Sequence, residues 1–248
     1  MSTAERHSRS LLQPADVDFA SYATCPLPNR FADSYYCCLV TSVDKPHLVY
    51  KVTKLSCEQV QRLVEGHNSR RLRIAQGDVP GQPAATDMTT MIWDEELAMK
   101  ASRWARRGQF NHNPDRTIDS GRFETGENLY IYRTTDESYE LDVDQALEDW
   151  FDEYKDFEYG PMTSDEFSDP DRQIGHYTQM VWSNSTFVGC GMSQTRKSGS
   201  TQFLVVCNYG PQGNIIGEPP YQTDGAEQYE LQCGAGVEDC DKKYGDEC

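Results

Sequence analysis

The chain has 248 residues, of which 25% are charged and 37% hydrophobic. This length suits one sizeable domain with an extension, and no apolar run approaches the roughly 18–20 residues of a membrane-spanning helix. We therefore expect no membrane span. The formal net charge of −17, from 23 basic and 40 acidic residues, repels nucleic acid and anionic lipid, so we also expect no nucleic-acid partner.

Acidic residues are concentrated in one part of the chain. Residues 136–171 contain fifteen Asp or Glu and one Lys, a net charge of −14, which leaves only −3 elsewhere. We interpret this segment as a solvated acidic face. Carboxylates also suit hard cations, but the fixed spacing of a calcium-binding loop is absent.

Residues 1–55 are expected to form a cysteine-bearing extension without regular structure. They are rich in Pro, Ser and aromatic residues, show no long hydrophobic periodicity, and include Cys25, Cys37 and Cys38. We therefore expect disulfides to hold this extension. The first residues, through about Asp18, are expected to be disordered.

The cysteine count indicates a secreted protein. Nine cysteines are many for a cytosolic chain and normal for an extracellular one. Because the number is odd, at least one thiol is free or pairs outside the chain, which allows a disulfide-linked dimer. Residues 1–13 have no apolar core of signal-peptide length, so we interpret the start as one from which any signal has been removed. Asn184 begins a glycosylation sequon, which a secreted protein can use.

A helix is predicted over residues 57–76. Ser56 and Gln59 have the spacing of a capping box at its start. One helical face is apolar and carries Val60, Leu63, Val64 and Ile74. His67 lies near the same face, and we interpret it as a hydrogen-bonded structural group rather than a ligand. The basic run at residues 70–73 is interpreted as a solvated face.

A second helix is predicted from Glu95 to Arg107, after a loop over residues 77–90 that is broken by Pro and Gly. Asp94 is the expected N-cap, and Gly108 lies just past the end. The apolar face of this helix carries Trp93, Leu97, Ala101, Trp104 and Ala105. Its alanines allow close packing.

A strand and a third helix follow. Residues 127–132, entered through Gly126, are predicted as the strand. The third helix is predicted from Asp142 to Glu158, because apolar residues recur there at helical spacing. Glu153 lies at the edge of the apolar stripe, where its side chain can reach a groove. The aromatic residues of this helix exceed what one buried face needs; they include Trp150, Phe151, Tyr154 and Phe157.

The last third of the chain contains a hairpin and a tail. Residues 187–194 and 201–209 are predicted as antiparallel strands joined across residues 196–199. The tail from Pro219 onward is Gly-rich and acidic, and its cysteines are Cys233, Cys240 and Cys248.

Two blocks of the sequence resemble the paired signatures of one known family. The first, Gly175–Trp182, places the imidazole of His176 in a half-buried segment with one wet edge. The second is Phe203–Ile215. Together the blocks resemble the CAP superfamily, which comprises cysteine-rich secretory proteins, antigen-5 venom allergens and plant pathogenesis-related proteins. The invertebrate antigen-5 (venom-allergen-like) branch resembles this chain most.

The resemblance implies an α+β fold: a three-layer α-β-α sandwich (the CAP fold) with disulfide-tied N- and C-terminal extensions. We place the CAP domain at residues 56–221, between the extension 1–55 and a tail 222–248. The resemblance also implies a disulfide between Cys190 and Cys207, seventeen residues apart on the two hairpin strands. The pairing of the other cysteines stays open.

The resemblance implies a cavity built from His112, Glu127, Glu153 and His176. Two imidazoles and a carboxylate satisfy zinc or another divalent cation and leave a position for water, which the second glutamate could hold. Glu148 lies close enough in the sequence to compete with Glu153. The alternative is a buried polar cluster in which each histidine is bonded to a glutamate.

The function that the resemblance implies is that of a secreted, non-enzymatic binding protein. Its ligand would be a small hydrophobic molecule (a fatty acid, an eicosanoid or a sterol) or an extracellular protein target. An acyl groove between the first and third helices would be lined by Trp150, Phe151, Tyr154 and Phe157, unless these residues pack in the core. The alternative from another class is a metal-dependent hydrolase, a peptidase or esterase, using the same His/Glu cavity. A third is a structural surface protein that binds nothing small.

Overall fold

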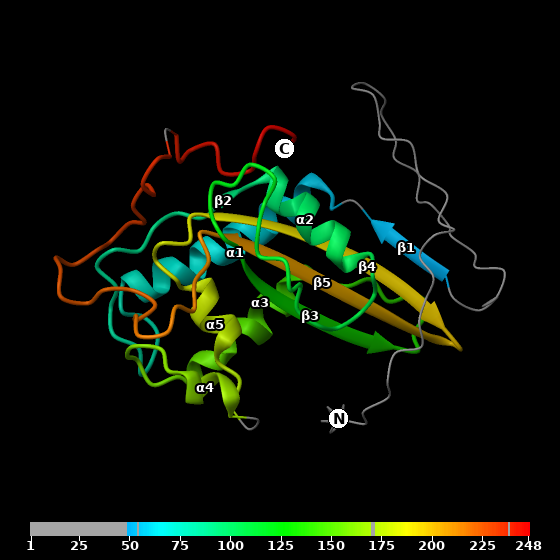
Figure 1. Ribbon diagram of the computed structural model, residues 1–248, viewed down its shortest axis with the longest axis horizontal. Helices are drawn as coiled ribbons and strands as arrows, with labels where there is room; N and C mark the ends of the chain where they lie inside the picture. The colour runs from blue at the N-terminus through cyan, green and yellow to red at the C-terminus, as the bar shows by residue number, and fades with distance from the viewer. Residues whose placement is uncertain (1–48, 54, 170–171, 238) are drawn as a thin grey trace. The chain divides into compact units, whose positions relative to one another are not determined.

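The structure is a computed structural model (Figure 1). It describes residues 49–53, 55–169, 172–237 and 239–248. The predictions for the chain before residue 49, including disorder through Asp18 and disulfides of Cys25, Cys37 and Cys38, lie outside the described residues. Among those that are described, no helix is long and apolar enough to cross a membrane.

One five-stranded sheet forms the centre of the fold. Its strands are β1 Val49–Thr53, β2 Ile92–Trp93, β3 Gly126–Thr134, β4 Phe187–Lys197 and β5 Ser200–Gly210. Four of them hydrogen-bond in the antiparallel order β1-β4-β5-β3. The short strand β2 pairs in parallel with the first two residues of β4.

Helices cover both faces of this sheet. They are α1 Cys57–Ala75, α2 Glu95–Ala105, α3 Val143–Phe151, α4 Ser164–Ser168 and α5 Gly175–Met180, with a 3-10 helix η2 at Asp152–Lys155. The strand β4 carries glycines where α2 packs directly against it. The helices α1, α3 and α5 contribute to a separate core on the opposite face.

Alternate residues of β5 belong to the two cores. Leu204 and Val206 pack with Trp104 of α2, whereas Val205 and Tyr209 belong to the larger cluster that includes α1, α3 and α5. This alternation is expected because successive side chains of a strand point to opposite faces. The predicted three-layer α-β-α sandwich is therefore confirmed.

The predicted starts of the first two helices are confirmed. At α1 the backbone N–H of Gln59 donates to Ser56 Oγ at 3.2 Å, and Ser56 N–H donates to Gln59 Oε1 at 3.0 Å. At α2 the side chain of Asp94 accepts the N–H of Leu97 at 2.9 Å. The helix α2 ends two residues before the predicted Arg107.

The predicted third helix, Asp142 to Glu158, is wrong beyond Phe151. There the α-helix ends, and the chain tightens into the 3-10 helix Asp152–Lys155. Acidic side chains at the C-terminal end of a helix oppose its dipole. In addition, the carboxylate of Glu153 accepts backbone N–H groups at the start of α5, which ties this turn to another element.

The expectation that residues 1–55 lack regular structure is wrong for residues 49–53. They form β1, which pairs with β4 so that Val49 lies opposite Arg196 and Thr53 opposite Met192. The strand β4 has 11 residues, and β2 pairs only with its first two. The remaining residues on this edge of β4 can therefore pair with β1.

The predicted hairpin is confirmed, with longer strands than expected. Lys197 pairs with Ser200, which leaves Ser198 and Gly199 as the turn. Their φ angles are 52° and 79°. Positive φ at both central residues is the conformation that matches the twist of a two-residue hairpin.

The solvated face predicted for residues 70–73 is wrong for Arg71, which is fully buried. Its guanidinium donates to the carbonyl oxygens of Thr89, Met180, Trp182 and Ser183 at 2.8–3.1 Å. The carbonyl of Met180, the last residue of α5, needs such a donor because it has no partner within the helix. Burial lowers the pKa of Arg71 to about 9.

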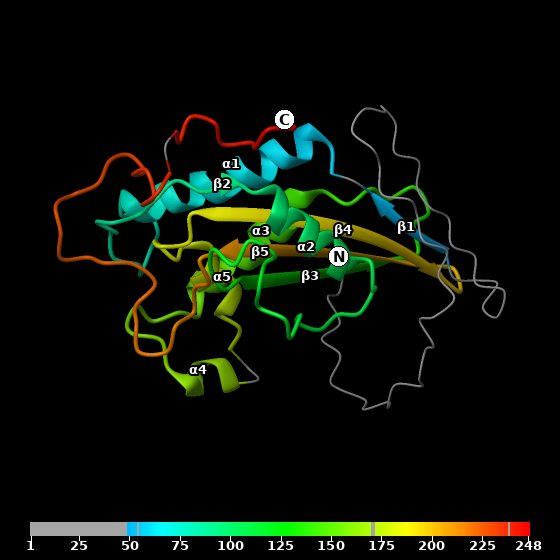
Figure 2. The same ribbon diagram turned by 45° about the horizontal axis from the view of Figure 1, so that its top comes forward.

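The C-terminal tail runs along the segment between α1 and α2. Thr90 N–H donates to Gln232 O at 2.8 Å, and Gln232 N–H donates to Met88 O at 3.0 Å. The red end of the chain lies beside the start of α1 in Figure 2. Two disulfides close the region, Cys57–Cys248 and Cys233–Cys240. The predicted disulfide-tied C-terminal extension is therefore confirmed.

Candidate functional site

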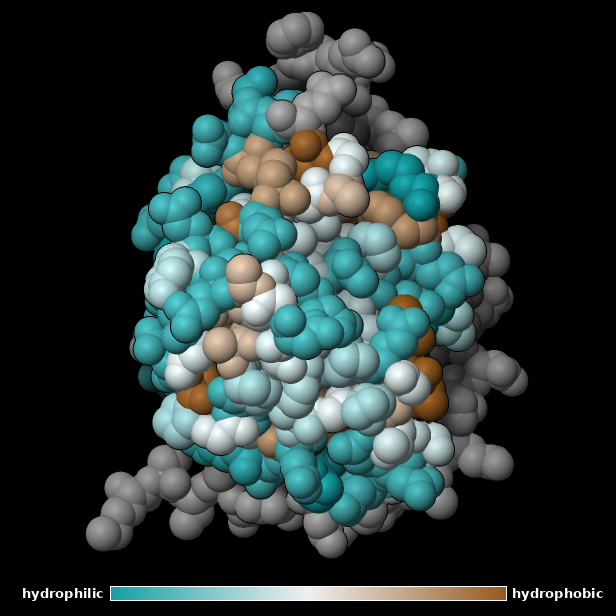
Figure 3. All heavy atoms as spheres, turned by 90° about the vertical axis from the view of Figure 1, so that its left-hand side faces the viewer, coloured by the Kyte–Doolittle hydropathy of each residue, from teal (hydrophilic) through white to brown (hydrophobic). Residues whose placement is uncertain are grey.

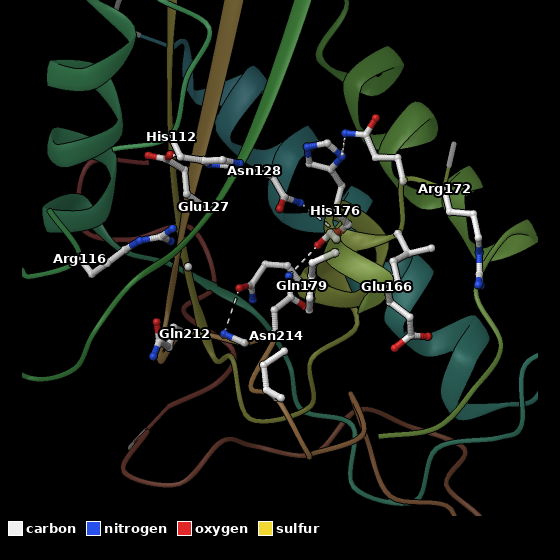
Figure 4. A pocket seen from close by; sticks show the side chains of 17 residues that line it. His112, Arg116, Glu127, Asn128, Glu166, Arg172, His176, Gln179, Gln212 and Asn214 are labelled. Carbon is white, nitrogen blue, oxygen red and sulfur yellow. Dashed lines mark hydrogen bonds and ion pairs between the residues drawn. The ribbon is translucent and has the colours of Figure 1, made fainter. Parts of the chain in front are cut away.

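A pocket of about 440 Å³ lies where five segments of the described chain meet. These are the loop after α2, the start of β3, the helix α4, the segment from residue 172 through α5, and the loop after β5 (Figure 4). Its lining is mostly polar and includes His112, Glu127 and His176. Three of the four residues predicted for the cavity therefore share one pocket, while Glu153 lies behind His176.

The first side of the pocket holds the pair His112 and Glu127. His112 Nδ1 lies 2.9 Å from Glu127 Oε1, which also accepts the backbone N–H of Asn113 at 2.9 Å. The other carboxylate oxygen accepts Asn208 Nδ2 at 3.2 Å. The Glu127 side chain is only 2% exposed, whereas that of His112 is 53% exposed. A buried carboxylate thus orients an imidazole that faces solvent.

The second side holds the pair His176 and Glu153. His176 Nδ1 lies 2.6 Å from Glu153 Oε1. The second oxygen of Glu153 accepts the backbone N–H groups of His176 at 2.9 Å and of Tyr177 at 3.1 Å. Trp150 stacks on the His176 ring, with centroids 5.9 Å apart and planes at 23°. Carboxylate and indole together fix this ring.

The carboxylate partners determine which ring nitrogen of each histidine is left for a ligand. Because an ionised carboxylate only accepts hydrogen bonds, Nδ1 must be the donor in both pairs. In a neutral imidazole the remaining nitrogen, Nε2, is then an acceptor or a metal ligand. Within the described residues, no hydrogen bond occupies Nε2 of His112 or of His176.

The four predicted residues form two pairs rather than one cluster. In the part of the chain that the structure describes, no three His, Cys, Asp or Glu side chains are close enough to hold a metal ion together. Each imidazole is oriented by the carboxylate behind it, an arrangement that is common among metal-binding histidines. The metal role of His112, Glu127, Glu153 and His176 stays a prediction.

A buried hydrogen-bond network supports the site from the core side. Asn128 Nδ2 donates to the backbone oxygen of His176 at 3.0 Å and to Tyr209 Oη at 3.1 Å. Tyr209 in turn lies 2.9 Å from His67 Nε2, and His67 Nδ1 lies 2.7 Å from Leu63 O. The interpretation of His67 as a hydrogen-bonded structural group is confirmed. The sequence did not indicate that this group connects to His176.

The aromatic residues predicted to line an acyl groove pack against rings of α5. Phe151, Tyr154 and Phe157 surround the ring of Tyr177, with centroids 5.6–6.3 Å apart. Trp150, Phe151 and Phe157 are each at most 4% exposed. None of the four lines the pocket at His176. Their lipid-binding role stays a prediction, and their packing is the core alternative.

Several pocket residues had no signal in the sequence. Four of them line the pocket from a short helix and three loops, in parts of the chain as distant as residues 116 and 216: Arg116, Phe167, Arg172 and Ile216. No periodicity or motif links them. Only the folded arrangement of these segments brings them together.

The remaining predicted sites lie away from the pocket. Cys190 and Cys207 form a disulfide across neighbouring strands, the pair that the family resemblance implies. Asn184 is exposed in a turn, so a glycan there would meet no packed surface. Six of the nine cysteines form three disulfides. The other three lie outside the described residues, so a dimer through an odd thiol stays a prediction.

Comparison with known proteins identifies relatives across most of the described chain. The family model of the cysteine-rich secretory protein family, CAP, matches residues 64–209. Venom allergen 5 of Vespa velutina is 35% identical over 179 residues, which cover 70% of this chain and 85% of the relative. Venom allergen 5 of Vespula pensylvanica is 37% identical over 180 residues, covering 70% and 83%.

Two solved structures are also similar to this chain in sequence and fold. The crystal structure of NaASP2 with Zn²⁺ is 32% identical, with a TM-score of 0.56 over 69% of this chain and 88% of that one. Venom allergen-like protein 4 of Schistosoma mansoni is 30% identical, with a TM-score of 0.53 over 68% and 97%. The predicted resemblance to antigen-5 proteins is therefore confirmed at the level of sequence and fold.

Proposed function

Because the chain belongs to the cysteine-rich secretory protein (CAP) family and is venom-allergen-like, we propose that it is an extracellular binding protein without catalytic activity. The relatives reported above are venom allergens, and none is named as an enzyme. Three disulfides among the described residues are consistent with an oxidising compartment. The site of binding in this proposal is the pocket between His112 and His176.

The observation that carries the proposal is the pairing of each pocket histidine with its own glutamate. Both pairs leave Nε2 as the ring nitrogen for a ligand, and both imidazoles line the same pocket. Two neutral imidazoles suit zinc or a similar divalent cation, with the other positions left to water or an exogenous ligand. A crystal structure of the relative NaASP2 is described as one with Zn²⁺, which supports zinc as the cation to test.

The pairing of each pocket histidine with a glutamate also argues against hydrolysis. A metal-dependent hydrolase would need a general base, beside the metal ligands, to accept a proton from the attacking water. Glu127 and Glu153 are occupied by ring and backbone N–H groups. If a metal takes Nε2 of both imidazoles, neither these glutamates nor the histidines are left to act as that base, so we favour binding over turnover.

Thermal unfolding in the presence of metal tests this proposal. Zinc at pH 7.5 should raise the unfolding temperature of the wild-type chain, because it binds the folded state alone. The shift should disappear in His176→Ala and in His112→Ala. It should also weaken at about pH 5.5, because a protonated imidazole cannot bind a metal. Magnesium, which prefers oxygen ligands, is the control cation and should give no shift.

One result of the zinc experiment would contradict the proposal. If zinc raises the unfolding temperature equally in wild type and in both histidine variants, the metal binds elsewhere. In that case, the pairing of imidazoles with carboxylates is only structural.

A further inference from the structure

We propose that the outer face of α2, together with the end of β3, binds a sulfated polysaccharide through Arg103, Arg106, Arg107 and Arg133. These four side chains are called the arginine row below. None of them lines the pocket described above, so the row is a second binding surface, separate from the candidate metal site.

Positive charge is concentrated on α2 and the loop after it. Residues 97–119 contain five Lys or Arg and two Asp, a net charge of +3, which leaves −20 for the rest of the chain. Salt screens exposed charges that lie more than about 10 Å apart. A local basic segment can therefore attract a polyanion although the chain as a whole is acidic.

The helical period places the arginines of α2 on its outer face. Three residues of this helix pack on the sheet: Ala101, Trp104 and Ala105. Arg103, Arg106 and Arg107 lie on the opposite side of the helix, and all three are exposed. With a rise of about 1.5 Å per residue, their Cα atoms lie within about 6 Å of one another along the helix axis. The guanidinium groups therefore form one compact positive surface.

These guanidinium groups are available for a ligand. Within the described chain, only Arg103 of the three has a carboxylate partner, and its Nη1 lies 3.9 Å from Asp119 Oδ2 with both side chains mostly exposed. An exposed pair at this distance contributes little, so a sulfate group can replace Asp119. The guanidinium of Arg107 lies over the ring of Trp104, 4.4 Å from its centroid. This stacking holds the group in place and leaves N–H donors along its edge.

Tertiary structure adds Arg133 of β3 to this face. Arg133 Nε donates to Gln202 Oε1 at 3.1 Å, and Gln202 Nε2 donates to the carbonyl oxygen of Gly108 at 3.2 Å. Gln202 thus joins Arg133 to the turn that follows α2. Arg133 is exposed, so it extends the positive surface from the helix onto the edge strand.

The carboxylates near the arginine row do not cancel its charge. Two of them have cations of their own, in the pairs Lys100–Asp115 and Arg196–Glu137. Asp119 and Asp136, which is three residues after Arg133, both stay negative. Counting these two against the four arginines leaves a net charge of +2. The row therefore remains positive when every neighbouring carboxylate is included.

The shape of the row favours a linear polyanion over a single small anion. The arginines are spread along the surface, so a small anion would contact one or two of them, whereas a chain with repeated sulfate groups can contact all four at once. Sulfate, like phosphate, accepts paired hydrogen bonds from a guanidinium. Hydrophobic residues offer no comparable continuous surface on the side that carries α4, where they form small patches among hydrophilic ones (Figure 3).

A sulfated polysaccharide fits the row better than duplex nucleic acid does. Glu95 and Glu96 lie in the first turn of α2, and the remaining surface is acidic. A duplex is wide enough to bring its phosphates against these carboxylates, whereas a single polysaccharide chain can follow the row alone. Sulfated polysaccharides also occur outside cells, so this choice of partner rests on the extracellular location in the proposed function.

Binding of a heparin octasaccharide to the full chain tests the inference. Calorimetry should show saturable binding at about 50 mM salt that weakens steeply towards about 300 mM, because ionic contacts release counterions. The same oligosaccharide without its sulfate groups is the control ligand and should bind about tenfold or more weakly. A DNA duplex of equal charge should bind no better than this control.

Matched variants locate the surface. Arg106→Gln, Arg107→Gln and Arg133→Gln should each weaken heparin binding by about threefold to fivefold. The variant that also carries Arg103→Gln, with all four arginines changed, should show no measurable binding. Arg73→Gln is the control, because Arg73 is likewise exposed in the last turn of a helix, α1, and has no ion pair among the described residues. It should bind heparin as the wild type does.

Equal affinity for the sulfated and desulfated oligosaccharides would overturn the inference, and so would tighter binding of DNA than of heparin. Unchanged heparin affinity in the fourfold variant would place the binding elsewhere and also overturn it. Far-UV circular dichroism checks that this variant keeps its helices, and the single variants decide the matter if it does not.

The zinc experiment separates this inference from the proposed function. His176→Ala should lose the zinc shift and keep its heparin affinity, because His176 is not part of the arginine row. No heparin binding together with an intact zinc shift in the wild type refutes the inference alone. No heparin binding and no zinc shift refute both.

Discussion

His67 is a titratable group that the fold keeps neutral. It is fully buried, and its two ring nitrogens are engaged by Leu63 O and Tyr209 Oη. Burial lowers its pKa from 6.5 to about 3. The unfolded chain takes up a proton at this position as the pH falls through 6.5, and the folded chain does not until about pH 3. Acid therefore favours unfolding: the stabilisation is complete above pH 6.5 and is lost as the pH falls below it.

The free energy of unfolding should consequently fall with acidification, with a contribution from His67 on the order of 1.4 kcal/mol per pH unit well below the pKa of the unfolded state. Urea unfolding at pH 7, 6 and 5 measures this slope. The variant His67→Gln should be less stable at pH 7, because an amide, whose two polar atoms share one carbon, does not match the positions of both ring nitrogens, but its stability should depend less on pH. An identical slope in the variant would show that other groups cause the acid sensitivity.

At the scale of elements, the contact between α2 and the sheet depends on glycine in β4. A Cβ at Gly191 would overlap the backbone of Ser102, and one at Gly189 would overlap the backbone near Ala98. Backbone atoms cannot move aside as a flexible side chain can. The absence of side chains at these two positions lets the helix lie directly on the strand.

Gly191→Ala should therefore destabilise the fold by about 2 kcal/mol or more, as an overpacked core does. Gly160→Ala is the matched control, because a Cβ there meets nothing within 4 Å, and it should have little effect or slightly stabilise the chain. Urea midpoints of the two variants give the comparison. Equal midpoints would mean that α2 moves away from β4 to make room for the added Cβ without lowering the free energy of unfolding.

Elements could be predicted from the sequence where their signals are local. The capping box of Ser56 and Gln59 involves residues three apart, so the start of α1 was predictable. The end of α3 was not, because it depends on the contact of Glu153 with α5, 23 residues further along the chain. The residues of the pocket also differ in whether the sequence indicated them. Family motifs indicated His112 and His176, whereas Arg116 and Arg172 become pocket residues only through tertiary structure.

The apolar face of the third helix shows a second reason why part of the structure could not be predicted from the sequence. Periodicity indicated correctly that Trp150 and Phe157 are buried, but it could not tell what they are buried against. The structure places Trp150 against the His176 ring and Phe151 against Tyr177. A stripe that could line a lipid groove and a stripe that packs a core have the same spacing, so only the packing distinguishes them.

At the scale of the whole described chain, the tail joins parts that are distant in sequence. The oxygen of Lys243 accepts the backbone N–H of Trp93 at 2.7 Å, and Asp246 N–H donates to Glu95 Oε1 at 3.0 Å. The hydroxyl of Tyr244 bonds to Glu65 of α1. These contacts fix the last residues beside the start of α1 and of α2, where the disulfide Cys57–Cys248 secures them.

That disulfide should contribute more to stability than the other disulfide of the tail. Cys57–Cys248 spans 191 residues, whereas Cys233–Cys240 spans only 7. In the chain-entropy model the long loop stabilises by about 5 kcal/mol and the short one by about 2 kcal/mol, because closing a long loop removes more freedom from the unfolded chain. The double variant Cys57→Ser/Cys248→Ser should therefore lose more free energy of unfolding in urea than Cys233→Ser/Cys240→Ser. Limited proteolysis should also cut the tail of the first variant sooner after Lys242 or Lys243. If removal of the short disulfide costs more, the length of the closed loop does not determine how much each disulfide stabilises the fold.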